Sequence, residues 1–180
     1  AFGDDKKSDA INLYNLAAEL GSSRAYLRLG ICHMEGKCGL EENNEKAFGY
    51  YSKAAALNHP EGKYALGLCY LNGLGTTKDP LKGAACLYQS GLLGFRQGML
   101  GLCEVYQTDK YGMKNVKSFI KYNEEFSELY FNGSGYFVIA FMYLGGKDVK
   151  VNYAKAVDYL EKGLKLTPYP KFYCNLADLY

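Results

Sequence analysis

The sequence has little of the chemistry that most enzymes and metal sites need. It contains two histidines, His33 and His59, in 180 residues. Its six cysteines include no CxxC pair and lack the paired spacing of zinc ligands. Cys32 and His33 are neighbours, so on a helix they point to different sides and do not form a nucleophile–base couple. We therefore expect no catalytic residue, no metal site and no cofactor.

The chain also lacks an excess of charge of one sign and a long hydrophobic run. The formal net charge of +2 offers no electrostatic case for nucleic acid, an acidic substrate or an anionic membrane. No apolar run approaches the roughly 20 residues that span a bilayer. With 48% hydrophobic and 22% charged residues, the composition is that of a soluble globular protein. We expect neither nucleic-acid binding nor membrane insertion.

What the sequence does contain is a repeat. One pair of a large and a small residue recurs at intervals of 36 or 37 residues, which is typical of repeat proteins. The copies are Leu29-Gly30, Leu66-Gly67, Leu102-Cys103, Ile139-Ala140 and Leu176-Ala177. A small residue stands four positions before the first four copies, at Ala25, Gly62, Gly98 and Gly135, and Phe172 breaks this pattern in the fifth. A ring stands four positions after each pair, at His33, Tyr70, Tyr106, Tyr143 and Tyr180.

A second helical pattern alternates with the first. It places an alanine four residues before an aromatic or large residue, as in Ala10/Tyr14, Ala47/Tyr51, Ala84/Tyr88 and Ala156/Leu160. The copy around Ser118 and Tyr122 is degenerate, and the loop 108–115 before it has lost most of the repeated residues. The two patterns predict antiparallel helix pairs, in which the recurrent small residues let neighbouring helices approach.

These motifs resemble a known family. A helix, a tight turn and a second helix, with LG and Y on the first helix and A-xxx-Y on the second, resemble a tetratricopeptide-type repeat. The loops YLNGLGTTKDPLKGA (70–84) and YLGGKDVKVNYAKA (143–156), with the turn AAELGSSRAYLRLG (17–30), are similar to the Sel-one-like repeat. The resemblance covers nearly the whole chain.

The resemblance implies an all-α fold, an α/α superhelical solenoid of about ten helices without strands. We expect one domain over residues 1–180, part of a longer array, with repeat units near 10–22, 23–58, 59–94, 95–131, 132–167 and 168–180. Residues 1–9 are expected to be frayed or part of a preceding loop, with Ser8 or Asp9 capping a helix from about residue 10. Gly133 is expected in the turn that stops the helix 116–130.

The resemblance also implies where a partner would bind. In tetratricopeptide-like solenoids the first helix of each pair lines a concave groove. Positions beside the LG-xx-Y set would then contact an extended peptide or a helix through arginine and aromatic anchors. The selected residues are Arg24, Arg28, Glu61, Tyr64, Gln97, Glu104, Phe137 and Phe141. The alternative is that the apolar members of this set belong to the core.

The sequence therefore predicts a non-catalytic protein–protein interaction scaffold, with possible self-association through the ends of the stack. Two alternatives are a hydrolase, by analogy with the cysteine-rich branch of the family, and a helical-repeat RNA reader, against which the near-neutral charge argues. The cysteines do not follow the spacing of that secreted branch, so we expect reduced thiols and a cytoplasmic location. The sequon Asn132-Gly133-Ser134 keeps a secretory or luminal location open.

Overall fold

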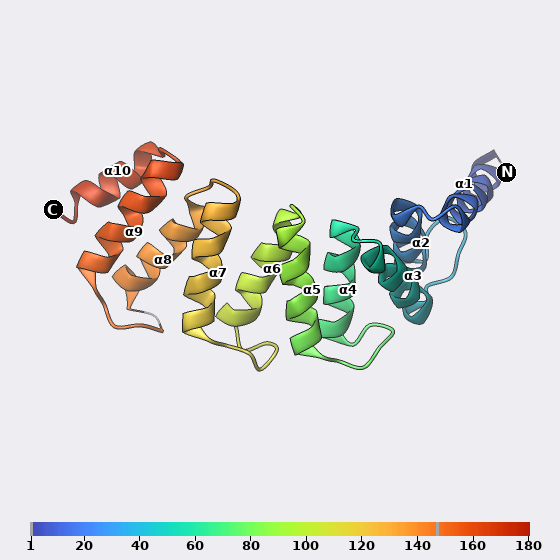
Figure 1. Ribbon diagram of the computed structural model, residues 1–180, viewed down its shortest axis with the longest axis horizontal. Helices are drawn as coiled ribbons and strands as arrows, with labels where there is room; N and C mark the ends of the chain where they lie inside the picture. The colour runs from blue at the N-terminus through green and yellow to red at the C-terminus, as the bar shows by residue number, and fades with distance from the viewer. Residues whose placement is uncertain (1, 147) are drawn as a thin grey trace. The chain divides into compact units, whose positions relative to one another are not determined.

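The protein is built of helices alone. The computed structural model describes residues 2–146 and 148–180, with side chains from residue 9 onward, and over these residues it contains ten helices and no strand (Figure 1). The predicted all-α fold is confirmed. The helices are α1 (Phe2–Glu19), α2 (Ser23–Glu35), α3 (Asn44–Ala56), α4 (Pro60–Asn72), α5 (Pro80–Leu92), α6 (Arg96–Gln107), α7 (Val116–Leu129), α8 (Ser134–Gly145), α9 (Tyr153–Leu166) and α10 (Pro170–Ala177).

The helices form two compact units, residues 1–101 and 102–180, and the division falls within α6. In the first unit, α1 packs on α2, α2 on α3, α3 on α4 and α4 on α5. In the second unit, α7 packs on α8, α8 on α9 and α9 on α10. Within each unit these helices pack on their neighbours in sequence, as in a stack of hairpins. The single domain and its repeat boundaries stay a prediction.

The N-terminal segment differs from the prediction. Helix α1 begins at Phe2, so Ser8 and Asp9 lie within a helix and do not cap one. The polar composition of residues 2–9 suggested a loop, but none of these residues is proline. Adding a residue to an existing helix is far easier than nucleating one, so a polar segment can extend it.

The same hydrogen-bonding pattern occurs at the start of the second helix of each pair. The side chains of Asn43, Asp79, Asn115 and Asn152 each accept a hydrogen bond from the backbone N–H three residues later, at 2.8 to 3.0 Å. The backbone N–H of each cap residue also donates to the carbonyl of the repeat ring position, His33, Tyr70, Tyr106 or Tyr143. The cap therefore satisfies a free N–H of the new helix and ties it to the helix before. The pattern persists in the degenerate copy, at Asn115.

The turns between hairpins also repeat. Gly21, Asn58, Gly94 and Phe131 all have a positive φ, and they lie 36 or 37 residues apart. Asparagine and glycine reach this left-handed region easily, whereas Phe131 does so with φ 47° and an exposed ring. The stop predicted at Gly133 is therefore displaced to Phe131. Gly133 is required for a different reason, because a Cβ there would lie 2.1 Å from the carbonyl oxygen of Gly163.

Stacked rings join the two helices of a hairpin. His33 stacks on Tyr50, Tyr106 on Tyr122 and Tyr143 on Tyr159, with ring centroids 5.3 to 6.0 Å apart. In each pair, the ring at the repeated position of the first helix contacts the residue seven positions after the cap of the second helix. In the second copy this position is Cys86, and Tyr70 instead meets Phe48 edge-on at 5.4 Å. These pairs fill the layer between helices with contacts that exceed simple area burial.

The recurrent small residues hold the helices at close range. A Cβ on Gly62 would lie 2.7 Å from the Cβ of Ala54. A Cβ on Gly98 would lie 2.7 Å from both the backbone nitrogen of Gly91 and the carbonyl oxygen of Leu87. Backbone atoms cannot move aside as a flexible side chain can. The predicted packing role of these small positions is confirmed.

Two glycines of the first unit provide a matched test of this packing. Gly98→Ala should lower the free energy of unfolding by about 1–3 kcal/mol, because the new methyl overlaps backbone atoms. Gly49→Ala should raise it by up to about 1 kcal/mol, since Gly49 is exposed within α3 and nothing lies near its added Cβ. Urea unfolding followed by circular dichroism measures both. Equal effects of the two substitutions would contradict the close approach at Gly98.

Candidate partner-binding site

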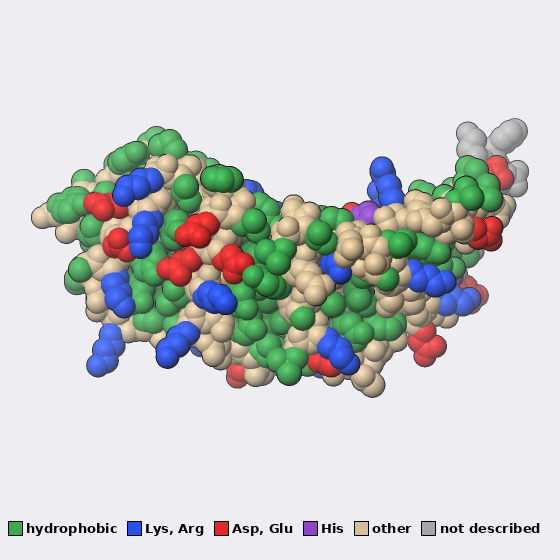
Figure 2. Space-filling view, viewed as in Figure 1, with side chains coloured by type: hydrophobic (Ala, Val, Ile, Leu, Met, Phe, Trp, Pro, Cys, Tyr) green, Lys and Arg blue, Asp and Glu red, His purple; other side chains and the backbone are tan. Residues whose placement is uncertain are grey.

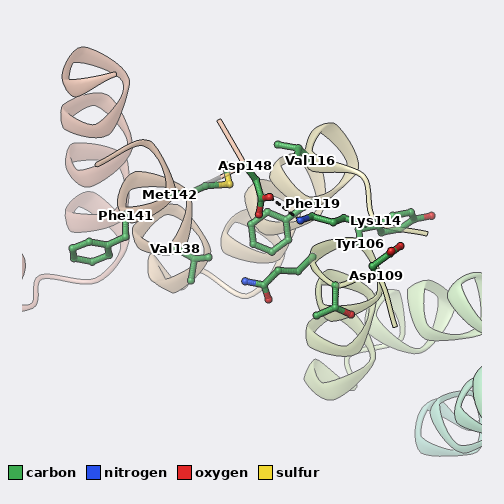
Figure 3. Close-up of a pocket in the computed structure, with 11 residues that line it drawn as sticks. Tyr106, Asp109, Lys114, Val116, Phe119, Val138, Phe141, Met142 and Asp148 are labelled. Carbon is green, nitrogen blue, oxygen red and sulfur yellow. Dashed lines mark hydrogen bonds and ion pairs between the residues drawn. The ribbon is translucent and has the colours of Figure 1, made fainter. Parts of the chain in front are cut away.

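The second unit contains a pocket of about 640 Å³ (Figure 3). Its walls come from the end of α6, the loop that follows, the start of α7, the middle of α8 and the loop after α8. The lining residues are Tyr106, Gln107, Thr108, Asp109, Lys114, Val116, Phe119, Val138, Phe141, Met142 and Asp148.

One side of the pocket is apolar. Val138 and Phe141 on α8 each keep 43% of their surface exposed, and Met142 lies on the same helix. Val116 and the buried ring of Phe119 contribute from α7. On the face drawn in Figure 2, hydrophobic side chains reach the surface among charged ones. Isolated exposed apolar residues are common, but several that converge in one hollow indicate a binding surface.

The rim of the pocket is polar and contains an ion pair. Lys114 Nζ lies 2.7 Å from Asp148 Oδ1, and both side chains are partly exposed (Figure 3). The pair joins the loop before α7 to the loop after α8. Asp109, which is exposed, adds a second carboxylate. A partly exposed pair contributes at most about 1 kcal/mol, so the rim can rearrange around a ligand at small cost.

The degenerate repeat explains why a pocket forms here. The fourth residue after the helix cap is Ala47, Gly83 and Ala156 in three copies, and all three are buried. The fourth copy has Phe119 at this position, and its ring lines the pocket. A ring cannot pack as closely as a methyl or a hydrogen. Replacing the small residue by phenylalanine therefore changes the helix contact at a position where the other copies pack closely.

The predicted groove residues of the first unit are mostly exposed. Arg24 and Arg28 lie exposed on α2, Glu61 on α4 and Gln97 on α6. Tyr64 is half-buried, and its ring centroid lies 5.2 Å from that of Phe95. These positions are accessible to a partner, and their role stays a prediction.

The predicted groove residues of the second unit differ in their exposure. Glu104 is exposed, and Phe141 lines the pocket. Phe137 belongs to the core: it is 3% exposed and its ring centroid lies 3.8 Å from that of Phe172. The prediction of Phe137 as a partner contact is therefore wrong. Its ring fits against Gly163 of α9, where an added Cβ would lie 2.3 Å from the ring, and helical spacing alone could not reveal this glycine.

Several pocket residues were outside the selected set. These residues are Val116, Val138, Met142, Lys114 and Asp148, of which two lie in loops and three are apolar residues on helices. The signal that could have found them is the loss of repeated residues over 108–115. A repeat that departs from its consensus is free to serve a purpose other than stacking.

The groups that could carry chemistry are dispersed or buried. Burial raises the pKa of the Cys69 thiol to about 11 and that of Cys103 to about 12, so both stay protonated at neutral pH. Among the side chains of residues 9–146 and 148–180, no three His, Cys, Asp or Glu groups converge as metal ligands would. Over the same part of the chain, the helices fall short of the length and apolar character that a bilayer crossing requires.

Comparison with known proteins identifies the family to which these repeats belong. The Sel1 repeat is matched by residues 3–22, 23–59, 60–95 and 133–167, well over half of the chain. The chain belongs to the Sel1 repeat family. The matched repeats leave out residues 96–132, the segment that supplies Tyr106 and Phe119 to the pocket.

Two curated relatives of this Sel1 repeat protein come from Schizosaccharomyces pombe. It is 32% identical to chitin synthase regulatory factor 2 over 105 residues, which are 56% of this chain and 20% of that protein. It is 31% identical to chitin synthase regulatory factor 1 over 106 residues, 58% of this chain and 22% of that protein. The match thus spans about a fifth of each relative.

Solved structures agree with the solenoid fold. A Sel1 repeat protein from Oxalobacter formigenes superposes with a TM-score of 0.65 at 21% identity, over 87% of this chain and 62% of that one. Cysteine-rich protein B from Helicobacter pylori superposes with a TM-score of 0.51 at 30% identity, over 70% of this chain and 90% of that one. In this Sel1 repeat protein the six cysteines are free thiols.

His33 gives this Sel1 repeat protein a predictable response to pH. Burial lowers the pKa of His33, and the charge of Lys46 lowers it further, while a hydrogen bond with the backbone of Glu41 opposes both. The unfolded chain therefore binds a proton near pH 6.5 that the folded chain resists. This histidine lowers stability as the pH falls through that range and has no effect above it.

We expect His33→Phe to reduce this loss of stability, because phenylalanine keeps a ring on Tyr50 and cannot be protonated. Urea unfolding of both proteins between pH 7.5 and pH 5.0 measures the effect. His59 is present in both and cancels in the difference. The difference in the free energy of unfolding between the two proteins should widen toward low pH. A difference that is the same at every pH would contradict the prediction.

Proposed function

We propose that this Sel1 repeat protein is a non-catalytic binding module that holds a partner protein, with the pocket of the second unit as an anchor site. The observation that carries the proposal is the convergence of apolar side chains from α7 and α8, with Val138 and Phe141 exposed, beside a polar rim. This combination is typical of sites where one side chain of a partner is buried and its neighbours stay solvated.

The size of the pocket favours an anchor side chain over a whole ligand surface. A volume of about 640 Å³ lies within the range of small-ligand sites. A stable protein interface covers about 800 Å² on each partner, which is more than one pocket provides. The partner would therefore insert an aliphatic or aromatic residue between Val138 and Phe119 and continue along the neighbouring surface.

The rim suggests what flanks that anchor. Lys114 is paired with Asp148, so the exposed carboxylate of Asp109 is available to attract a cation. A peptide or helix with a large apolar residue next to a lysine or arginine suits this arrangement. In the first unit, Arg24 and Arg28 on α2 would contact an acidic part of the same or another partner.

The relatives support a binding role rather than a catalytic one. Both curated relatives are named regulatory factors of chitin synthase. Sel1 repeats cover most of this chain, which fits a supporting, non-catalytic function. We place the protein in the cytoplasm, in agreement with its free thiols.

The pocket can be tested with a pair of aspartate substitutions. Val138→Asp should weaken partner capture by roughly tenfold or more, because a charge replaces an apolar contact in the pocket. Leu129→Asp is the matched control: Leu129 is 39% exposed, lies in the same unit and does not line the pocket. Quantitative affinity capture from a cell extract, with cross-linking to locate the contact, measures both. Proteins captured equally by wild type and Val138→Asp would contradict the assignment.

A charge reversal tests the surface of α2. Arg28→Glu should weaken capture of partners that contact the first unit, because an acidic patch would meet a carboxylate in place of a guanidinium. Lys165→Glu, at an exposed position of α9, changes the net charge equally and should bind as wild type does. Circular dichroism checks that helical content is unchanged in both. Normal binding by Arg28→Glu would remove this surface from the site.

A further inference from the structure

Two cysteines of the first unit lie against each other. The Sγ atoms of Cys32 and Cys38 are 3.0 Å apart. Cys32 is buried in the last turn of α2, and Cys38 is half-buried in the loop between α2 and α3. Both are free thiols. The separation is about 1 Å longer than the roughly 2.05 Å of a disulfide bond.

The backbone holds the two thiols together. Gly36 ends α2 with φ 59°, and the N–H groups of Gly36 and Lys37 both donate to the carbonyl of Cys32. These bonds turn the chain back over the last turn of α2. At the far end of the loop, the N–H of Asn43 donates to the carbonyl of His33 at 2.8 Å. The loop is thus attached to α2 on both sides of Cys38.

Comparison of the loops shows that Cys38 occupies a demanding position. The second residue after the helix-ending glycine is Gly75 after α4 and Asp148 after α8, with φ near 66° in both. Cys38 has φ 60° at the same place. Glycine and aspartate adopt this conformation readily, whereas most other residues lose about 1–2 kcal/mol per residue. The cysteine is therefore kept where its backbone is strained and its thiol faces Cys32.

We propose that Cys32 and Cys38 form an oxidation site that accepts small-molecule disulfides of the glutathione class. The Cys38 thiolate attacks one sulfur of the oxidised disulfide, whose S–S bond breaks and releases one thiolate. The Cys32 sulfur, after losing its proton to water, attacks Sγ of Cys38, and the second small thiolate leaves. The two cysteines lose two protons and two electrons in total, and the disulfide reagent is reduced to two thiols.

The environment of each thiol assigns these roles. Cys38 is the more accessible of the two, so it meets the reagent first. Burial and the hydrogen bond with Cys38 raise the pKa of Cys32 to about 12, so Cys32 stays protonated until Cys38 has reacted. Its slow deprotonation is offset by its position next to the mixed disulfide, since neighbouring groups react at a very high effective concentration.

A metal site is the main alternative for two close cysteines. Two thiolates on a tetrahedral Zn²⁺ lie about 3.8 Å apart, given Zn–S bonds of about 2.3 Å. The observed 3.0 Å is shorter. Among the residues that the structure describes, the pair also has no third ligand of the kind zinc needs. Disulfide formation is the chemistry that the spacing favours.

The sequence allows a direct test by mass spectrometry. Trypsin cleaves after Arg28, Lys37 and Lys46, so Cys32 and Cys38 fall on separate peptides, 29–37 and 38–46. We would treat the folded full chain with oxidised glutathione at pH 8, block the remaining thiols with iodoacetamide and digest it. The expected result is a linked pair of these peptides that dithiothreitol separates, with four of the six thiols alkylated.

Variants separate the two steps. Cys32→Ser should accumulate glutathione on Cys38, because the resolving thiol is absent. Cys38→Ser should leave Cys32 unmodified, because it is buried. Cys86→Ser, which removes another half-buried thiol of the first unit, should form the link as wild type does. Wild-type protein that keeps six free thiols, stops at a mixed disulfide on Cys38, or links another cysteine would overturn the proposal.

Discussion

Close backbone contact across each turn between hairpins is the constraint on which the structure depends. At Gly98 and Gly135 an added Cβ would lie within 2.7 Å of a backbone atom of the preceding helix. Helices at this range bury their side chains in the layers on either side, and the rings stack there. The cap residues, tied to the ring positions by their N–H groups, hold each new helix in the same register.

The degenerate copy shows how such a stack acquires a binding site. Its cap, Asn115, and its ring stack, Tyr106 on Tyr122, both follow the pattern of the other copies. The fold is therefore preserved. The pocket arises from the small position, where Phe119 replaces the alanine or glycine of the other copies, and from the loop that contributes Lys114. Function can be added to a repeat protein where packing is relaxed and backbone hydrogen bonds are kept.

The loops after the first helices show a similar division of labour. Their backbone course is shared, with a left-handed residue two positions after the helix-ending glycine. The side chain at that position differs: Gly75 has none, Asp148 pairs with Lys114, and Cys38 meets Cys32. One backbone conformation thus presents a hydrogen, a carboxylate and a thiol at equivalent places. Loops carry such variation because their side chains are free of the stacking that constrains the helices.

The sequence by itself determined the helices, their order and the small and ring positions, because these depend on spacing along one chain. It could not separate Phe137 from Phe141, which lie one helical turn apart on α8. The tertiary structure buried Phe137 against Gly163 and Phe172 and left Phe141 in the pocket. It also brought Lys114 to Asp148, 34 residues away. Which side chains meet across helices depends on how deeply each one is buried, and the spacing of residues along the sequence carries no information about that burial.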